Sequence, residues 1–276
     1  MSEFSKSQKR IAAFILENYD KAAFITASKL GKLVEVSEST VVRFAMQLGY
    51  EGYPSMQRAL QEMIRSRLTS TQRIQAAGDI FERQDILGSV LQSDIEKLRE
   101  VVNKANRDEF TRVTDLIMQA RHIYILGVRS SSFVAGYLNF YMHLLFENVT
   151  LVQSNAAGEI LEQLFRIGPG DVLIAISFPR YSKVTINTVK FARDRGATIV
   201  AMTDNDLSPI YQMSDAALLA PCEMISFVDS MAAPVSVINA LLLALANRVG
   251  ADVSATFEEL EDIWNEYSVF GKMDDE

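Results

Sequence analysis

The chain has 276 residues, of which 49% are hydrophobic, so it is long enough for two domains and excludes a disordered protein. Its single cysteine, Cys222, excludes an internal disulfide and a cysteine-based metal cluster, and is typical of a reducing cytosol. The charged start MSEFSKSQKR lacks a following apolar segment, and the apolar run 232–246 is too short for a membrane span. We therefore expect a cytoplasmic protein with no membrane contact.

Charge is distributed unevenly along the chain. The formal net charge is −8, but residues 1–75 hold 11 Lys and Arg against 7 Asp and Glu, which leaves 16 against 28 in the remainder. A basic N-terminal part on an acidic body is the asymmetry expected when only one part contacts nucleic acid phosphates.

The first predicted helix covers residues 5–18, with an apolar stripe formed by Ile11, Phe14 and Ile15. Three cations lie near its start, namely Lys6, Lys9 and Arg10. They either contact the DNA backbone or are simply solvated, and the sequence leaves both interpretations open.

The stretch 26–49 predicts two short helices joined by a tight turn at residues 34–36. Thr26 is a good N-cap for the first helix, and Ser37 is a good N-cap for the second. Gly49 is placed to end the second helix as its C′ residue. Two helices with this spacing indicate a helix-turn-helix motif.

The second of these helices has two different faces. At about 100° per residue, its apolar face consists of Val41, Phe44, Ala45 and Leu48. The opposite face carries hydroxyls, an amide and a guanidinium, which suit the base edges and phosphates of a major groove. The predicted DNA contacts are Ser37, Ser39, Thr40, Arg43 and Gln47. The alternative is an ordinary helical hairpin with a solvated polar face.

The chain after Gly49 continues as helix. Pro54 is expected at the first position of a helix that runs to about residue 68. Residues 69–108 predict a helical connector whose apolar residues, from Ile86 to Val102, recur at helical spacing. Such a connector is either a dimer contact or a strap across the second domain. We expect a helix-turn-helix domain over 1–77, the connector over 78–108 and a second domain over 109–276.

From residue 109 the pattern changes to alternating helices and apolar strands. Strands are expected at 122–126, 149–153, 172–177, 198–203 and 216–220, with a short helix beginning at Ser208 and Pro209. A long apolar helix at 230–248 and a helix carrying Trp264 end the chain. The fold class is therefore α/β: an all-α N-terminal domain followed by a doubly wound, five-stranded parallel sheet.

Two hydroxyl-rich loops, 127–132 and 177–182, each follow a strand and lead into a helix. Hydroxyls and free N–H groups at a helix N-terminus favour an anion, and nearby cations strengthen this preference. The alternative is that the serines only cap their helices. Neither loop is a dinucleotide or Walker motif, so no cofactor is expected. The candidate ligand contacts are Gly127, Arg129, Ser130, Ser131, Ser132, Ser177, Arg180, Tyr181, Ser182, Lys183 and, in the first turn of a neighbouring helix, Glu159.

The whole chain resembles the MurR/RpiR family of bacterial transcription regulators, in which a helix-turn-helix domain precedes a sugar isomerase (SIS) domain. The matching runs are VSESTVVRFAMQLGYEGYPSMQ, ILGVRSSSFVAGYL, IGPGDVLIAIS, FARDRGATIVAMTDNDLSPI and SFVDSMAAPVSVINAL. The resemblance implies a homodimer or homotetramer that binds double-stranded operator DNA and senses a phosphorylated sugar or a related anionic metabolite. It also implies that Ser131, Ser177 and Ser182 hold the phosphate.

One loop departs from the family pattern. The usual second loop is similar to SxSGxT, but here Pro179 and Arg180 replace the middle serine and the glycine. Arg180 either binds the phosphate or pairs with a carboxylate ligand. The class of ligand is therefore less well defined by the sequence than the fold.

Several other residues have alternative interpretations. His122 and His143 are expected in the core or an interface, and Ser226, Asp229 and Ser230 either cap the last long helix or line the pocket. We expect a regulator and not an enzyme. The alternatives are a sugar-phosphate isomerase with an accessory domain, for which Glu159 and His143 are the only plausible bases, and a repressor that needs no ligand.

Overall fold

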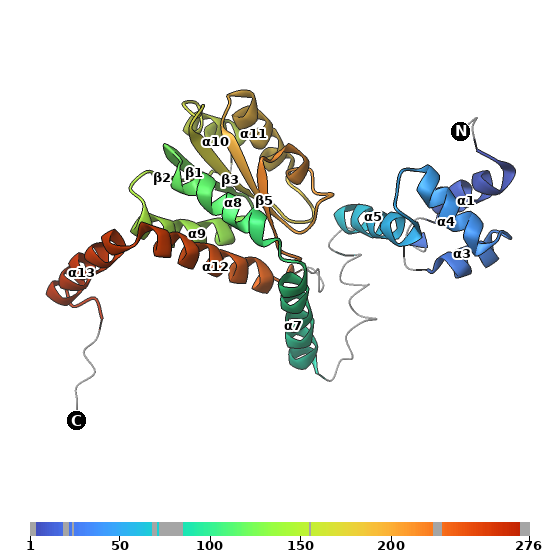
Figure 1. The fold of residues 1–276 in the computed structure, drawn as a ribbon, viewed down its shortest axis with the longest axis horizontal. Helices are drawn as coiled ribbons and strands as arrows, with labels where there is room; N and C mark the ends of the chain where they lie inside the picture. Colours follow the sequence, from blue (N-terminus) through green and yellow to red (C-terminus); the bar gives the residue numbers. More distant parts are fainter. Residues whose placement is uncertain are drawn as a thin grey trace. The chain divides into compact units, whose positions relative to one another are not determined.

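The computed structural model describes residues 4–18, 22–23, 25–67, 71, 85–154, 156–222 and 228–270. The chain divides into two compact units, Met1–Asp79 and Ile80–Glu276 (Figure 1). Each unit has its own hydrophobic core, so each is described by itself.

The first unit is helical. Its helices are α1 (Lys6–Glu17), α3 (Ala27–Leu33), α4 (Glu38–Gln47) and α5 (Tyr53–Arg67). Their inner faces form one core, which contains Ile11, Leu30, Val41, Phe44 and Met56. Pro54 is the second helical residue of α5 and not the first, because Tyr53 already has helical geometry.

The turn between α3 and α4 is set by local hydrogen bonds and by one close approach. The Thr26 side chain accepts a hydrogen bond from the Lys29 amide at 3.2 Å, and the Ser37 side chain accepts one from the Thr40 amide at 3.3 Å. A Cβ at Gly31 would lie 2.8 Å from the Val36 carbonyl oxygen, so the two helices approach closely only because this residue is glycine. Both predicted N-caps are confirmed.

The predicted apolar face of α4 is wrong at one position. Val41, Phe44 and Ala45 are buried as expected, but Leu48 is 45% exposed. Leu48 is the C-cap, and Gly49 follows with φ +91°. The helical periodicity therefore ends before it can direct the Leu48 side chain into the core.

The second unit contains a five-stranded sheet with the order β2-β1-β3-β4-β5. All four strand pairings are parallel, as the continuous apolar strands predicted. The elements in chain order are α7 (Ile86–Lys104), α8 (Arg107–Met118), β1 (His122–Gly127), α9 (Ser131–Leu145), β2 (Val149–Val152), α10 (Ala157–Gln163), β3 (Asp171–Ile176), α11 (Lys183–Asp194), β4 (Thr198–Thr203), η1 (Tyr211–Met213), β5 (Ala216–Leu219), α12 (Ala232–Val249) and α13 (Ala251–Glu266).

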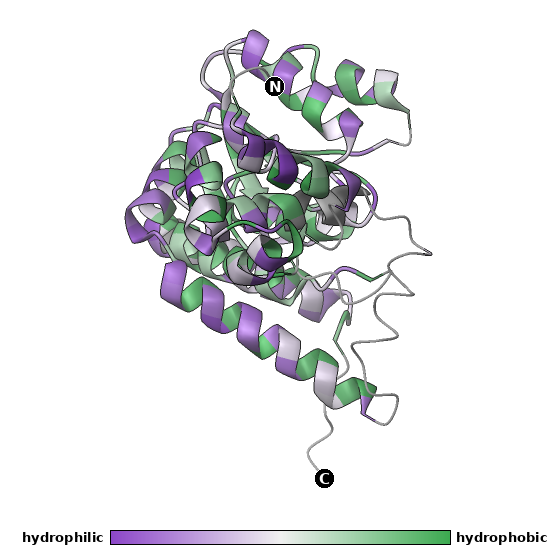
Figure 2. Cartoon of the chain, turned by 90° about the vertical axis from the view of Figure 1, so that its right-hand side faces the viewer, coloured by the Kyte–Doolittle hydropathy of each residue, from purple (hydrophilic) through white to green (hydrophobic). Residues whose placement is uncertain are grey.

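Successive strand residues face two separate hydrophobic layers. In β1, Ile123 and Ile125 pack with α8, α9 and α12, whereas Tyr124 and Leu126 pack with α10 and α11. Figure 1 shows these two groups of helices on opposite faces of the sheet. Figure 2 shows hydrophilic and hydrophobic residues alternating along the helices, as expected for helices that bury one side. The short helix predicted at Ser208 is instead the 3-10 turn η1.

The connector helix α7 belongs to the second unit, where it packs against α12. The Ser230 hydroxyl, just before α12, donates a hydrogen bond to the Asp94 carboxylate of α7 at 2.5 Å. The other side of α7 exposes apolar residues, which are Ile86, Leu87, Leu91, Ile95 and Val102. The structure therefore shows α7 as a strap on its own domain and leaves an apolar face uncovered.

Helix α12 packs on the core of the second unit. It is longer than the apolar run 232–246 of the sequence. Its 18 residues, with a mean hydropathy of 1.5, are enough by length and composition to cross a membrane. However, Ile238, Leu241 and Leu245 are fully buried against the sheet. Packing within the domain thus explains the apolar residues on one face of α12, whereas Leu243 on another face is exposed.

The starts of β1 and β3 are joined by an ion pair, which gives a testable prediction. Asp171 is 1% exposed and accepts two hydrogen bonds from the Arg121 guanidinium, at 2.8 and 2.7 Å, and one from the Gly168 amide at 2.9 Å. Burial raises the pKa of the Asp171 carboxyl, but these hydrogen bonds outweigh it and hold the pKa below the usual value. Asp171→Asn is expected to lower the free energy of unfolding by about 1–2 kcal/mol at pH 7.

The pH dependence of this effect has a definite sign. A carboxyl whose folded pKa is depressed stabilises the fold above its unfolded pKa, about 3.9, and loses this contribution as the pH falls through its folded pKa. Urea unfolding followed by circular dichroism is therefore expected to show a gap between wild type and Asp171→Asn that narrows below pH 4. Equal stability at pH 7 would contradict the prediction.

Candidate functional site

The polar face of α4 is exposed, as a DNA-reading helix requires. Ser39, Arg43 and Gln47 are exposed, and Thr40 is half-buried. The Arg43 side chain lies back along its helix, with Nε donating to the Ser39 carbonyl at 3.3 Å. The exposed Ser37 hydroxyl lies 2.9 Å from that of Ser39 and 2.8 Å from that of Thr40. The structure thus brings the five predicted DNA contacts to one surface.

Helix α1 supplies neighbouring groups. Its Gln8 side chain donates a hydrogen bond from Nε2 to the side-chain oxygen Oε1 of Gln47. Lys6 and Lys9 are exposed, and Arg10 forms an ion pair with Glu35 of the turn at 3.4 Å. Because exposed ion pairs contribute at most about 1 kcal/mol, a DNA phosphate can compete for Arg10.

The two hydroxyl-rich loops lie side by side at one edge of the sheet. Gly127, at the end of β1, is paired with Ile176, at the end of β3. The chain leaves β1 toward β2 on one side, whereas β3, β4 and β5 follow on the other. This is the topological switch point of the sheet, where ligands of open α/β folds bind in the crevice beyond the strand ends.

The first loop makes a tight entry into α9. A Cβ at Gly127 would lie 2.4 Å from the Ser131 carbonyl oxygen and 2.8 Å from the Ala135 Cβ. Arg129 is exposed with φ +57°, and the Ser132 hydroxyl donates to its carbonyl at 2.6 Å. Within the described chain, Ser130 precedes α9 without a side-chain capping bond. Capping therefore does not explain Ser130, whose hydroxyl is exposed before the free N–H groups of α9.

The second loop is held at its start by burial and at its end by a helix cap. Ser177 is 3% exposed, and Phe178 is buried in the core below α9. The Ser182 side chain caps α11 by accepting from the Val184 amide at 3.2 Å, as the capping alternative predicted. Arg180 and Lys183 are exposed. The loop therefore presents cations at the same edge of the sheet as Ser130 and Arg129.

A buried hydroxyl lies in the first turn of α11. Thr185 is fully buried, and its Oγ1 has no hydrogen-bond partner among the described residues. In a helix, the Cα–Cβ bonds tilt toward the N-terminus, so the Thr185 side chain leans toward the second loop. An unpaired buried hydroxyl costs about 1–3 kcal/mol, and no contact among the described residues offsets this cost.

The sequence analysis missed a polar cluster at the end of β4. The Thr203 hydroxyl lies 2.8 Å from the Ser177 carbonyl oxygen and 2.8 Å from the Ser208 hydroxyl, and the Tyr181 hydroxyl lies 2.9 Å from Asp204 Oδ1. No functional role was predicted for the segment 204–207. The available signal was the run Thr-Asp-Asn directly after a buried parallel strand, at the edge where ligands bind.

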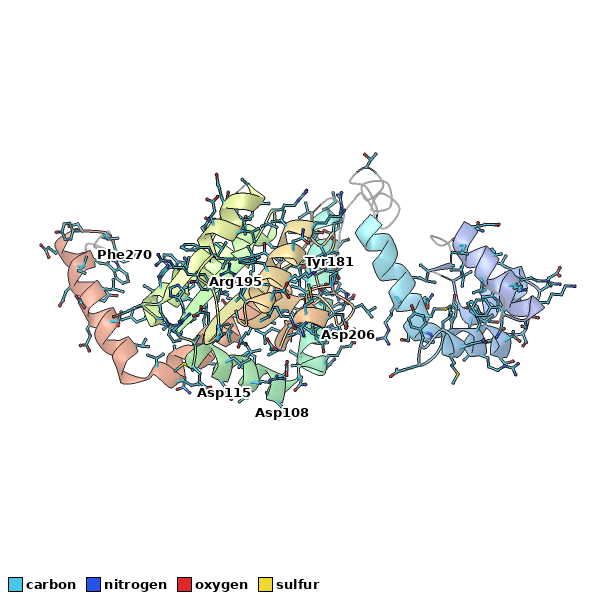
Figure 3. The ribbon with its side chains drawn as sticks, turned by 90° about the horizontal axis from the view of Figure 1, so that it is seen from above. Asp108, Asp115, Tyr181, Arg195, Asp206 and Phe270 are labelled. Carbon is cyan, nitrogen blue, oxygen red and sulfur yellow. The ribbon has the colours of Figure 1, made fainter. Side chains whose placement is uncertain are left out.

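Figure 3 shows Tyr181 and Asp206 toward one end of the domain, whereas Arg195, at the far end of α11, lies toward the other. Glu159 is exposed and follows β2, so it lies at the same edge of the sheet as the two hydroxyl-rich loops. Its carboxylate accepts a hydrogen bond from the Ser154 hydroxyl. All the predicted ligand contacts therefore belong to loops, or to the first turns of helices, at this edge of the sheet.

The histidines lie away from this edge. His143 is exposed near the C-terminal end of α9, so a core role for it is wrong. Twelve residues separate it from Ser131, or roughly 18 Å along the helix axis. His122 begins β1 at the opposite edge of the sheet, where its Nε2 lies 2.8 Å from the Thr150 hydroxyl.

The flanks of α12 are only partly described. Ser226 lies outside the described residues. The Ser230 hydroxyl accepts from the Ala232 amide at 3.3 Å, which fits the capping alternative, while its carbonyl accepts from the Cys222 thiol at 3.2 Å. Asp229 is half-buried.

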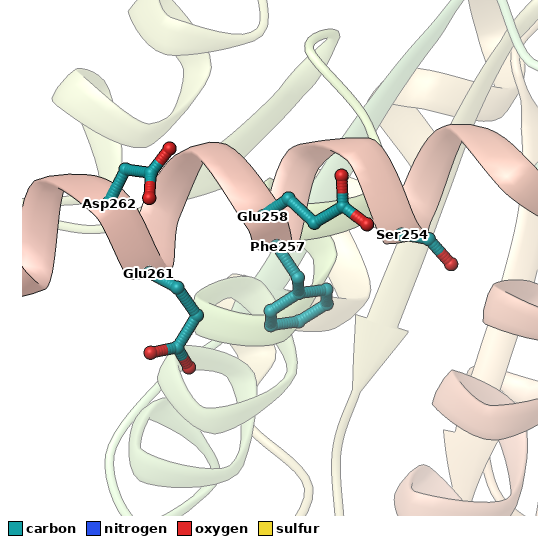
Figure 4. Close-up of a pocket in the computed structure, with 5 residues that line it drawn as sticks. All are labelled: Ser254, Phe257, Glu258, Glu261 and Asp262. Carbon is teal, nitrogen blue, oxygen red and sulfur yellow. The ribbon is translucent and has the colours of Figure 1, made fainter.

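A hollow on α13 is unsuited to an anion. It is lined by Ser254, Phe257, Glu258, Glu261 and Asp262, all from this single helix (Figure 4). Its three carboxylates would repel a phosphate. The candidate ligand site is therefore the strand edge and not this hollow.

Comparisons with known proteins agree with this arrangement. Residues 1–67 match the helix-turn-helix domain of the rpiR family, and residues 116–244 match the SIS domain. Similar relatives include uncharacterized HTH-type transcriptional regulators from Clostridium perfringens, 27% identical over 76% of this chain and 75% of the relative, and from Haemophilus influenzae, 28% identical over 78% and 75%.

Two solved structures share the fold. The sugar isomerase domain of an RpiR transcription factor from Sphaerobacter thermophilus has a TM-score of 0.62 at 25% identity, covering 65% of this chain and 99% of that one. The Vibrio vulnificus NanR protein, complexed with ManNAc-6P, has a TM-score of 0.62 at 23% identity, covering 97% and 96%. This chain therefore belongs to the rpiR family of helix-turn-helix transcriptional regulators and carries a SIS domain.

Proposed function

We propose that this regulator reads operator DNA with the polar face of α4 and senses a phosphorylated sugar at the crevice between the β1 and β3 loops. The observation that carries the proposal is the meeting of the two loops at the switch point of the sheet. Ligand binding would alter operator binding if the ligand prefers one arrangement of the oligomer over another.

The chemistry of the crevice supports a phosphate. The N-termini of α9 and α11 both face this edge, and each offers unpaired N–H groups and a positive dipole end. Arg129, Arg180 and Lys183 are exposed around them. The ManNAc-6P bound by the V. vulnificus relative is a phosphorylated amino sugar, which makes this ligand class the first to test.

We propose that the site senses its ligand without turning it over. Sugar isomerisation needs a base within hydrogen-bond reach of the sugar carbons. His143 lies at the other end of α9, and Glu159 is exposed and bonded to Ser154. Steady turnover of sugar phosphates by the full chain would overturn this part of the proposal.

We propose that the working unit is a homodimer or a homotetramer of it. On α9, Phe133 and Phe140 are two turns apart and exposed, and Leu243 is exposed on the adjacent α12. Large exposed apolar side chains on two adjacent helices favour a second protein surface. Two copies would also present two reading helices to successive major-groove half-sites. Light scattering after size exclusion tests the oligomeric state.

The ligand response gives the direct test. An operator is first selected from a random DNA library with the full chain, and its Kd is measured with and without a panel of sugar phosphates, including ManNAc-6P. We expect at least one ligand to change the operator Kd by about 5- to 150-fold. In the double variant Ser131→Ala, Ser177→Ala, the response is expected to vanish while operator binding without ligand is retained.

Ser236→Ala, an exposed serine of α12, is the matched control and is expected to keep the full response. A response that survives in the double variant would show that the ligand binds elsewhere. A wild-type protein that responds to none of the phosphorylated sugars would contradict the proposed ligand class.

A further inference from the structure

We infer that Tyr181 and Asp204 are positioning residues that hold the second loop, 177–182, in its ligand-binding shape. The inference rests on the proposed function, because it concerns the same site. Tyr181 is a candidate ligand contact from the sequence, but the role inferred here acts through its contact with Asp204 and not through the ligand. Their role is to fix the backbone and cations of the loop before the ligand arrives.

We call the hydrogen bond between the Tyr181 hydroxyl and the Asp204 carboxylate the latch, and it joins two loops. The Tyr181 hydroxyl donates to Asp204 Oδ1 at 2.9 Å, and Asn205 Nδ2 donates to Asp204 Oδ2 at 2.6 Å. Asp204 is only 8% exposed. A hydrogen bond to a carboxylate in such a setting is about twice as strong as one between neutral groups. The loop after β3 is therefore tied to the loop after β4.

Two neighbouring hydroxyls, those of Thr203 and Ser208, also connect these two loops. The Ser177 carbonyl oxygen, at 2.8 Å, and Asp204 Oδ1, at 3.1 Å, can only accept, so the Thr203 hydroxyl directs its single proton to these two oxygens, of which Ser177 is the nearer. The Ser208 hydroxyl, also 2.8 Å from Thr203 Oγ1, must then be the donor to it. Thr203 and Ser208 are fully buried, and this chain of bonds fixes the start of the loop next to the latch.

The opposite side of the loop is fixed by packing. Phe178 is buried in the hydrophobic layer that contains Val134 and Ala135 of α9. The loop is thus held at Ser177 and Phe178 at its start and by the latch at Tyr181 near its end. Between these points lie Pro179, which has a fixed φ, and the exposed Arg180.

This anchoring compensates for the unusual loop sequence. The middle serine and the glycine of the usual loop are replaced by Pro179 and Arg180, so fewer hydroxyls are available for the ligand. A loop that is fixed before the ligand arrives lowers the entropic cost of binding. The latch would therefore set the affinity of the site through the position of Arg180 and of the α11 N-terminus.

Tyr181→Phe isolates the latch, because it removes one hydroxyl and keeps the ring. Isothermal titration of the full chain with ManNAc-6P, and with inorganic phosphate as a second probe, is expected to show a roughly tenfold or greater loss of affinity. Asp204→Asn keeps an acceptor oxygen for Tyr181 and is expected to give a smaller loss. The double variant is expected to bind about as weakly as Tyr181→Phe alone, because residue 204 can no longer hold the loop once the Tyr181 hydroxyl is gone.

Tyr137→Phe is the matched control, because it removes a 2.7 Å hydrogen bond from a tyrosine to Asn239, between α9 and α12. It is expected to leave the Kd of both probes unchanged. If Tyr181 had a purely structural role, Tyr181→Phe and Tyr137→Phe would lower the thermal midpoint alike, and their Kd values for the two probes would not differ. Wild-type affinity in Tyr181→Phe would overturn the inference.

Hydrogen exchange of the full chain without ligand tests the latch independently of the ligand class. Tyr181→Phe is expected to speed exchange in peptides covering 177–184 and not in those covering 131–145. If the wild type binds neither probe but the variant shows this local change, the proposed ligand class fails and the latch stands. Unchanged exchange in 177–184 would refute the latch even if the wild type binds ManNAc-6P.

Discussion

Arg43→Ala is expected to reduce the discrimination between operator and unrelated DNA by about 5- to 150-fold. This range corresponds to the 1–3 kcal/mol that one bidentate arginine–guanine contact contributes. The full chain, titrated onto labelled operator and onto a scrambled duplex, gives both dissociation constants. The ratio of the two constants measures the discrimination.

The structure explains why the effect should be on discrimination and not on folding. Arg43 is exposed, and its contact is with the Ser39 carbonyl of its own helix. Its neighbours in the core, Val41 and Phe44, are buried and do not depend on the guanidinium. The thermal midpoint of Arg43→Ala is therefore expected to stay within the range of ordinary surface substitutions.

Arg58→Ala is the control for loss of one positive charge. Arg58 is an exposed arginine of α5 in the same unit. If it contributes only to the general field, its loss should weaken operator and scrambled DNA equally and leave their ratio unchanged. An Arg43→Ala protein with the same ratio as Arg58→Ala would show that Arg43 does not read bases.

Local signals in the sequence predicted most of the fold. Ser37 and Thr26 were recognised as N-caps because short hydroxyl side chains satisfy the free amides of a first turn. The strands of the sheet were found from continuous apolar runs, which a parallel sheet needs because helices cover both of its faces. Both serine loops follow strands of one parallel sheet, so their position at the carboxyl ends of the strands could be predicted. The order β2-β1-β3, which places the two loops side by side, could not, because right-handed crossovers are compatible with more than one strand order.

The errors arose where side-chain direction depends on how an element ends or on a distant partner. Leu48 has the spacing of a core residue, but the helix stops at that point. His143 lies between apolar residues, yet it faces outward near the end of α9. Tyr181 and Asp204 are 23 residues apart in the sequence. Their contact could not be deduced from spacing, because it depends on the pairing of β3 with β4.

Gly127→Ala is expected to disrupt the ligand site more than any single serine substitution. The added Cβ would lie 2.4 Å from the Ser131 carbonyl oxygen and 2.8 Å from the Ala135 Cβ. The first of these is a backbone atom, so the first turn of α9 must move away from the end of β1. We expect about 3 kcal/mol of lost stability, at the upper end of the usual range for overpacking, and at least a tenfold weaker ligand response.

Gly136→Ala provides the control on the same helix. A Cβ at this position has no atom within 4 Å, and alanine is the better helix former, so stability is expected to rise by about 0.5–1 kcal/mol with an unchanged ligand response. Urea unfolding and operator titration with sugar phosphates measure both quantities. If Gly127→Ala kept the wild-type response, the close approach of β1 to α9 would not shape the site. If it lost the response but kept full stability, the shift of the α9 N-terminus alone would account for the loss.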